Sequence, residues 1–519
     1  MSGEDLAGSG MKVRAKKNIA AVSGLTGISR VLGFVRDMVL AWLLGAGFLA
    51  DAFIVAFRIP NLLRRFMAEG AVSVAFVPVF SEAKERDGIE NAFVLARGIF
   101  TLMFLVLTAV VIVGEIVAPA VVAVIAPGFI NNEAFDTAVH LTRIMFPYIL
   151  LIGIVALFMG ILNSLGHFSA PAASPILLNV FMIGTPIVFY VMFPAFSSPA
   201  DAFAWGVIFG GIAQVLLHVI PLRRLRVPLL LSWNFIHPRL MQVASLMGVA
   251  AIGASVYQIN VFVGTLLASL LATGSVSYLY YANRIVELPL GLFAFAVGNV
   301  MLPSMSRAYA RSDPQKLSSL VGGSVSVVMV FTIPATIGIM VLAEPIFSML
   351  FLRGAFTMQD ALASAYALRM YAIGLCAVGI SRILTQALYA MQQARSVVRI
   401  SWIVLAINIL LCVALMVPMK HAGIALASSI SVSFQVILLY RVLVRKGIRP
   451  GGVPLMHYAR MIAAGIGMGI CLIPFLAMQF WFEGFTLSGL GLLFLSIFSG
   501  AVVYFGLLWV LGFRQSYTM

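Results

Sequence analysis

Arginines and carboxylates stand inside long apolar stretches of this sequence. The segment SRVLGFVRD places Arg30, Arg36 and Asp37 within a run of otherwise mostly apolar residues. A charge at the centre of a bilayer costs about 2.5–3.5 kcal/mol on insertion scales, so such residues normally face a protein interior or a water-filled cavity. Arginine stays charged when buried, and its planar guanidinium suits phosphate or carboxylate. The pattern predicts a permanently cationic lining for an anionic ligand.

Nine charged residues within predicted spans make up the candidate site. At about 100° per residue, Arg30 and Asp37 fall on one face of a helix. Arg284 and Glu287 are three residues apart and are therefore neighbours on a helix. The acids are expected to hold the arginines in place and to limit their repulsion while no ligand is bound. The full set is Arg30, Arg36, Asp37, Asp51, Arg58, Arg64, Arg65, Arg284 and Glu287.

Other arginines within the spans have a simpler interpretation. A long basic side chain can keep its stem in lipid and its charged head at the membrane surface, or it can pair structurally. This interpretation is favoured for Arg97, Arg143, Arg369, Arg382 and Arg460. At about 1.5 Å per residue, Arg30, Arg58 and Arg284 instead come out near mid-membrane. Arg64 and Arg65 approach a helix end, and both interpretations stay open for them.

The composition is typical of a polytopic membrane protein. Of 519 residues, 62% are hydrophobic and 10% charged, whereas about one-quarter of the residues of a soluble domain are charged. Apolar runs of about 18 or more residues recur from end to end, and each is long enough to cross a bilayer as a helix. The net charge of +15 is spread over short loops, so nucleic acid is not a predicted partner.

About fourteen helices are predicted, with turn-forming residues between them. Their approximate ranges are 18–45, 49–80, 92–125, 137–163, 171–193, 201–221, 237–269, 275–310, 316–349, 358–390, 398–418, 421–443, 455–479 and 485–512. Lysine and arginine are concentrated in alternate loops, and the loops of the other side hold only Arg353 and Lys420. This asymmetry predicts that both termini are cytoplasmic.

An internal repeat divides the predicted helices into two halves. DAFIVAFRIPNL (51–62) aligns without gaps on SYLYYANRIVEL (277–288), and Arg58 matches Arg284. Six helices is an even number, so the halves are expected to be parallel repeats with a central site between two lobes. The predicted layout is a cytoplasmic tail (1–17), an N-lobe (18–222), a basic linker (223–236), a C-lobe (237–450) and two further helices with a short tail (451–519).

Motifs for covalent chemistry are lacking in the sequence. There is no HExxH, no GxxxxGK[ST] and no GxSxG, and the histidines are too scattered for a local metal motif. GIGMG (465–469) lies within an apolar span, so it predicts a close helix contact rather than a nucleotide loop. These features predict no enzyme, no metal and no cofactor.

At this point a family resemblance can be stated. SRVLGFVRD, GAGFLADAF, RIPNLLRRFMAEGAVSVAFVPVF and YYANRIVELPLG resemble the MviN/MurJ family of lipid II flippases, within the multidrug/oligosaccharidyl-lipid/polysaccharide exporter superfamily. The resemblance covers essentially the whole chain. It implies a V-shaped pair of six-helix lobes, with the last two helices forming a groove for a polyprenyl tail. The essential cavity charges that it implies are Arg30, Arg36, Asp37, Asp51, Arg64, Arg284 and Glu287.

The resemblance implies translocation of lipid II, the undecaprenyl-diphosphate-linked peptidoglycan precursor, from the inner to the outer leaflet of the bacterial cytoplasmic membrane by alternating access. Coupling to the membrane potential or to a monovalent ion stays open, and cell-wall synthesis proteins are candidate partners. The alternative is a related exporter of another polyprenyl-diphosphate-linked glycan or of an amphiphilic drug. An exporter of cationic drugs would need an acidic cavity, which this arginine-rich sequence does not favour.

Overall fold

The computed structural model of the chain describes residues 3–64, 72, 75–228, 231–232, 238–476, 481 and 484–513. Within these ranges the side chains of 3–21, 63, 238, 244, 248–257 and 295 are left out of the description. Arg65, one of the predicted site residues, lies outside the described residues. All regular structure in the described ranges is helical.

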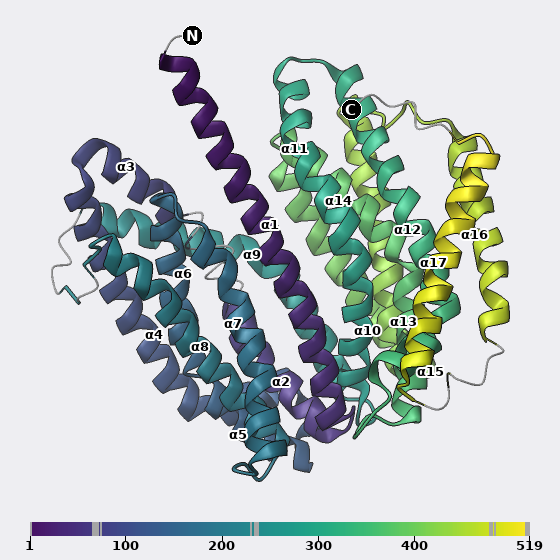
Figure 1. The fold of residues 1–519 in the computed structure, drawn as a ribbon, viewed down its shortest axis with the longest axis horizontal. Coiled ribbons are helices and arrows are strands. Elements are labelled where there is room, and N and C mark those ends of the chain that lie inside the picture. The colour runs from purple at the N-terminus through teal and green to yellow at the C-terminus, as the bar shows by residue number, and fades with distance from the viewer. Residues whose placement is uncertain are drawn as a thin grey trace. The chain divides into compact units, whose positions relative to one another are not determined.

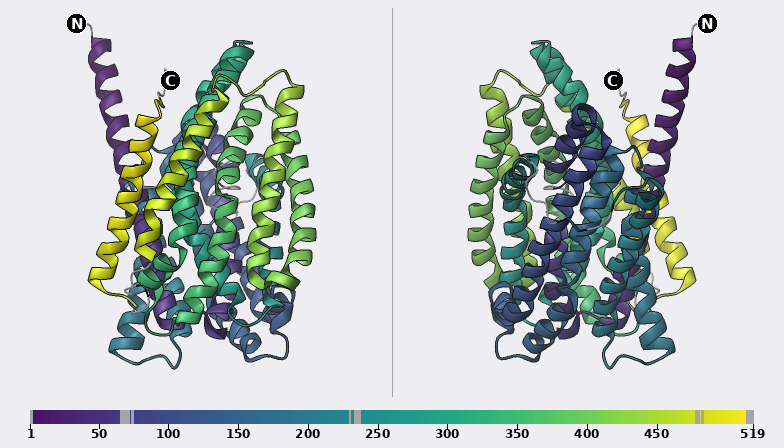
Figure 2. Two further views of the ribbon diagram at one scale, coloured as in Figure 1. Left: turned by 90° about the vertical axis from the view of Figure 1, so that its right-hand side faces the viewer. Right: turned by 90° about the vertical axis from the view of Figure 1, so that its left-hand side faces the viewer.

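The chain divides into two compact units (Figure 1). Unit 1 comprises Met1–Leu44 and Phe48–Gln258, and unit 2 comprises Gly45–Gly47 and Ile259–Met519. The helix α9 (Pro238–Ser269) contributes to both units. Most of the helices in each unit run roughly alongside one another, as the two side views show (Figure 2).

The helices of unit 1 are α1 (Gly3–Leu44), α2 (Phe48–Arg64), α3 (Val77–Asp87), α4 (Ile89–Ile125), α5 (Glu133–Met145), α6 (Tyr148–Ser164), α7 (Ser169–Pro186) and α8 (Pro199–Arg224). Those of unit 2 are α10 (Ser275–Pro289), α11 (Phe295–Ala310), α12 (Pro314–Phe351), α13 (Met358–Ile373), α14 (Leu375–Ala390), α15 (Ala394–Arg445), α16 (Leu455–Leu476) and α17 (Leu487–Val510). Short π-helical segments extend α7 through Ile187–Met192 and join α10 to α11 through Leu290–Ala294.

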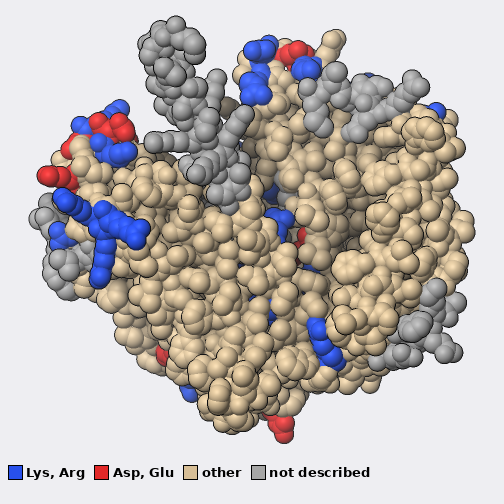
Figure 3. Space-filling model, in the orientation of Figure 1, with Lys and Arg blue, Asp and Glu red and all other residues tan. Residues whose placement is uncertain are grey.

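The structure confirms the predicted all-α fold with several membrane-spanning helices. Among the described residues, nine helical segments are long and apolar enough to cross a membrane, or ten if α13 and α14 form one span bent by 43°. The total of fourteen stays a prediction. The exposed face of α4, for example, carries Ile112, Val113 and Ile116, and an apolar outer face is expected for a helix that contacts lipid. Most of the surface seen in Figure 3 is likewise uncharged.

Three predicted helices differ in detail from the structure. The helix predicted over 137–163 breaks at Phe146–Pro147, where proline lacks the N–H that an unbroken helix needs. The helix predicted over 358–390 bends at Gly374. A Cβ added at Gly374 would clash with Ser429, since it would lie 2.7 Å from the Ser429 Cα. The helix predicted over 49–80 is described to Arg64, and α3 begins at Val77.

Two other sequence predictions are confirmed. The break expected between 418 and 421 occurs at Lys420, which has non-helical φ 51° and ψ −134° within α15. The contact expected at GIGMG is also present in α16. A Cβ on Gly465 would lie 2.5 Å from the Ile337 side chain of α12, and one on Gly467 would lie 2.5 Å from the Leu507 side chain of α17. These glycines therefore allow α16 to pack closely on both neighbours.

Candidate functional site

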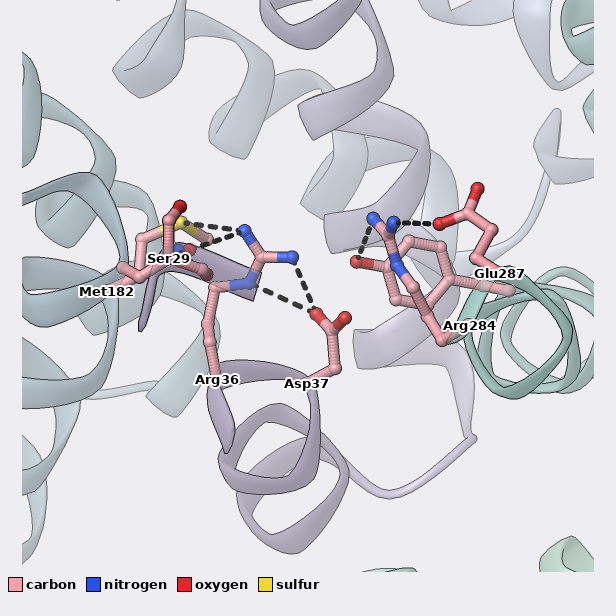
Figure 4. Close-up of polar contacts among 8 residues, drawn as sticks. Ser29, Arg36, Asp37, Met182, Arg284 and Glu287 are labelled. Carbon is pink, nitrogen blue, oxygen red and sulfur yellow. Dashed lines mark hydrogen bonds and ion pairs between the residues drawn. The ribbon is translucent and has the colours of Figure 1, made fainter. Parts of the chain in front are cut away.

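An ion pair on α1 is buried within unit 1 (Figure 4). Asp37 Oδ1 accepts from Arg36 Nη2 at 2.7 Å and from Arg36 Nε at 3.0 Å. Arg36 is 8% exposed and Asp37 is 1% exposed. Since burial without a partner would be costly for either charge, the two side chains stabilise each other. The pair therefore adds little net positive charge to the site.

Asn179 on α7 is another hydrogen-bond partner of Arg36, and sequence reasoning missed it. Its Oδ1 accepts from Arg36 Nη1 at 3.1 Å, and its Nδ2 donates to the backbone oxygen of Ser29 at 3.0 Å. One buried amide thus links α7 to the backbone just before Arg30 and to the guanidinium of Arg36. The only signal in the sequence is a polar residue in an apolar span, ILLNVFMIG.

We expect Asn179→Leu to weaken binding of a diphosphate lipid about tenfold, because a hydrogen bond to a charged group contributes about 1.5–3 kcal/mol. Asn408→Leu is the matched control, since Asn408 is a buried amide of unit 2 that bonds Ser431. Binding is measured on purified protein at equal folded fraction. If both variants lost affinity equally, Asn179 would have no positioning role.

Arg30 differs from Arg36 in its surroundings. Its side chain is exposed, and no carboxylate of the described residues forms an ion pair with it. An exposed guanidinium keeps its full set of N–H donors available to an incoming anion. Of the predicted site residues on α1, Arg30 is therefore the one best able to contact a ligand directly.

The remaining predicted residues of unit 1 lie on α2. Asp51 is 2% exposed in the first turn of the helix, where a negative charge complements the helix dipole. Arg58 and Arg64 are half-buried. Arg64 Nε donates to Asn61 Oδ1 at 3.2 Å. Within the described part of the chain, no cluster of three or more His, Cys, Asp or Glu is placed to hold a metal ion.

Unit 2 contributes a second arginine site, on α10 (Figure 4). Arg284 Nη1 donates to Glu287 Oε2 at 2.9 Å, as the three-residue spacing predicts. Arg284 Nη2 donates to the Tyr280 hydroxyl at 3.1 Å, and the guanidinium lies 4.8 Å from the centre of the Tyr280 ring. Asn283 Nδ2 donates to the other oxygen of Glu287 at 3.1 Å. Sequence reasoning did not assign Tyr280 a role.

This second site is less enclosed than the first. The side chains of Arg284 and Glu287 are 23% and 37% exposed, so water weakens the attraction between them. A phosphate group can therefore compete with Glu287 for the guanidinium, while Tyr280 continues to orient it. Arg284 and Arg58 also occupy matched positions of the sequence repeat, each in the interior of a helix.

Comparison with known proteins gives consistent matches. Residues 40–492 match the family model described as lipid II flippase MurJ. The chain is 34% identical to the lipid II flippase MurJ of Burkholderia cenocepacia, over 96% of this chain and 98% of that protein. It is 36% identical to the probable lipid II flippase MurJ of Vibrio cholerae, over 96% of this chain and 97% of that protein.

Solved structures show the same similarity. A structure of the lipid II flippase MurJ in an inward closed conformation matches with a TM-score of 0.77 and 25% identity, over 93% of this chain and 98% of that one. An inward-facing multidrug resistance transporter of the MATE family, in the MOP superfamily, matches with a TM-score of 0.65 and 14% identity, over 81% and 94%. The second likeness concerns the fold alone.

Proposed function

Because this chain belongs to the MurJ family of lipid II flippases, we propose that it translocates lipid II across the bacterial inner membrane. The headgroup moves from the inner to the outer leaflet by alternating access through a cationic cavity, while the polyprenyl tail stays in lipid. The protein in this proposal has fourteen spans in two six-helix lobes plus a C-terminal pair. No covalent bond of the substrate changes.

The observation that carries this proposal is the pair of arginines with accessible guanidinium groups, Arg30 in unit 1 and Arg284 in unit 2. Arg30 is exposed without an ion-pair partner among the described residues, and Arg284 is held by a half-exposed carboxylate. Both occur on helices that are otherwise mostly apolar. A permanent positive charge on a mostly apolar helix can stabilise an anion, such as a diphosphate, while the anion crosses the membrane.

The two kinds of site have different tasks in the proposed cycle. Arg36 is already neutralised by Asp37, so it shapes the α1–α7 contact and keeps the backbone near Arg30 in place. While no substrate is bound, the guanidinium of Arg284 forms an ion pair with Glu287. When the substrate binds, its diphosphate oxygens replace the Glu287 carboxylate. The Arg284 guanidinium therefore has an anionic partner before binding, during binding and after release.

Depletion of the protein in its host tests the function directly. Lipid II on the outer leaflet is measured with a reagent that cannot cross the membrane. Accessible lipid II should fall as the protein is depleted, while total lipid II rises. Unchanged accessibility would overturn the proposal. The alternative is a related exporter of another polyprenyl-diphosphate-linked glycan or of an amphiphilic drug. The multidrug resistance transporter that this chain resembles is similar to it in fold alone.

The proposed orientation places both termini in the cytoplasm. Starting from a variant without Cys376, Cys412 and Cys471, we expect Asn132→Cys and Ser197→Cys to react with an impermeant thiol reagent in intact cells. All three tested positions are exposed. Arg224→Cys should react only after the cells are opened, because basic loops face the cytoplasm. Labelling of Arg224→Cys in intact cells would reverse the orientation.

A further inference from the structure

A shallow, open groove lies on the outer face of α15, near the start of this helix in unit 2. It has a volume of about 570 Å³ and is lined by Ala394, Arg395, Val398, Arg399, Trp402 and Ile403. All six residues are exposed, whereas Val397 and Ile400 in the same turns are buried. This end of α15 therefore packs one face into its unit and leaves the opposite face, with the groove, open to the surroundings.

The groove carries two positive charges that have no counter-ion among the described residues. Arg395 and Arg399 are four residues apart, so their side chains lie on one helix face in successive turns. Neither forms a hydrogen bond or ion pair with another described residue. No Asp or Glu occurs in α15 or in the preceding α14. By contrast, Arg86 on α3 pairs with Glu82 at 3.0 Å.

Below the arginines, the same face of α15 becomes apolar. Trp402 and Ile403 line the groove, and Leu410, Val413 and Val417 continue the exposed stripe. The rise from residue 403 to residue 417 is about 21 Å at about 1.5 Å per residue. Half of a hydrocarbon core is about 15 Å thick, so the stripe is long enough to cover one leaflet. Tryptophan below a basic rim is typical of a membrane interface.

We propose that this groove binds one anionic diacyl phospholipid of the cytoplasmic leaflet. The lipid phosphate contacts Arg395 and Arg399, and one acyl chain lies along Trp402, Ile403 and the stripe below them. Charge complementarity selects an anionic headgroup, because the ammonium of a zwitterionic headgroup would be repelled by two uncompensated guanidinium groups. The groove uses none of the residues assigned to lipid II, so this proposal stands apart from the flippase function.

The test uses the purified full-length protein and native mass spectrometry with phosphatidylglycerol and phosphatidylcholine. We expect the wild type to bind phosphatidylglycerol more tightly. Arg395→Gln with Arg399→Gln should weaken that binding about 30-fold, the factor expected for two basic residues near a membrane surface. Binding of phosphatidylcholine should be unchanged.

The matched control is Arg441→Gln with Arg445→Gln, at the other end of α15. These arginines have the same spacing and are also exposed, and their loss removes the same charge. This control should leave the affinity for phosphatidylglycerol unchanged. Equal losses in both double variants, or equal binding of the two lipids by the wild type, would overturn the proposal. So would a groove variant that lost undecaprenyl diphosphate but retained phosphatidylglycerol.

Discussion

Arg30→Glu is expected to abolish function and to lower the affinity for diphosphate lipids by at least about 100-fold. The substitution removes a charge-assisted contact that contributes about 1.5–3 kcal/mol and adds repulsion of the same anion. Arg30→Lys should retain partial function, because lysine keeps a point charge without the two-pronged geometry of guanidinium. Growth of a strain that depends on the variant protein measures function, and native mass spectrometry measures affinity.

Arg460→Ala serves as the control for Arg30→Ala. Arg460 is a half-buried arginine on α16 whose Nη1 donates to the backbone oxygen of Gly512 at 3.0 Å. It should be dispensable, because its loss leaves an apolar span intact. If Arg30→Ala and Arg460→Ala supported growth equally well at matched protein levels, Arg30 would have no part in substrate binding.

Arg36→Met is expected to destabilise the protein by up to about 3–5 kcal/mol, since it removes the guanidinium that forms an ion pair with the buried Asp37. A double variant, Arg36→Met with Asp37→Leu, should recover most of that stability because both buried charges are gone. Thermal unfolding of the purified variants measures this effect.

The double variant should still fail to support growth, because Asn179 then loses the Arg36 guanidinium, one of the two groups of α1 that it binds. If Arg36→Met were as stable as the wild type, the buried pair would contribute nothing to the fold. If the double variant were fully active, Arg36 and Asp37 would be structural only.

Much of the fold could be predicted from the sequence because long apolar segments in a bilayer have few alternatives to a helix. The ranges of α4, α8, α12 and α17 are therefore close to those expected. The break at Lys420 was predictable as well, because turn-forming residues stand there. The bend at Gly374 was not, because Ser429, which lies against Gly374 and donates to the backbone oxygens of Met370 and Tyr371, is distant in sequence.

The candidate site was predictable as a set of charges but not as a set of contacts. Arg284 and Glu287 pair at the spacing that a helix dictates. Adjacent residues on a helix do not face each other, so the bond from Arg36 to Asp37 depends on the reach of a long side chain. The contact of Arg36 with Asn179 joins residues 143 positions apart, and local periodicity carries no information about it. Consequently, the sequence placed Asp37 on the helix face of Arg30, whereas the structure pairs Asp37 with Arg36.

In the proposed function, the arginines of this protein recognise a diphosphate. Binding of lipid II, undecaprenyl diphosphate and undecaprenyl phosphate to the purified protein, compared by native mass spectrometry, tests it most directly. We expect the two diphosphate lipids to bind about tenfold more tightly than the monophosphate, because the second phosphate adds charge and acceptor oxygens for guanidinium groups. Arg30→Ala should remove that difference. Equal binding of all three lipids by the wild type would contradict the account and would leave the polyprenyl tail as the source of affinity.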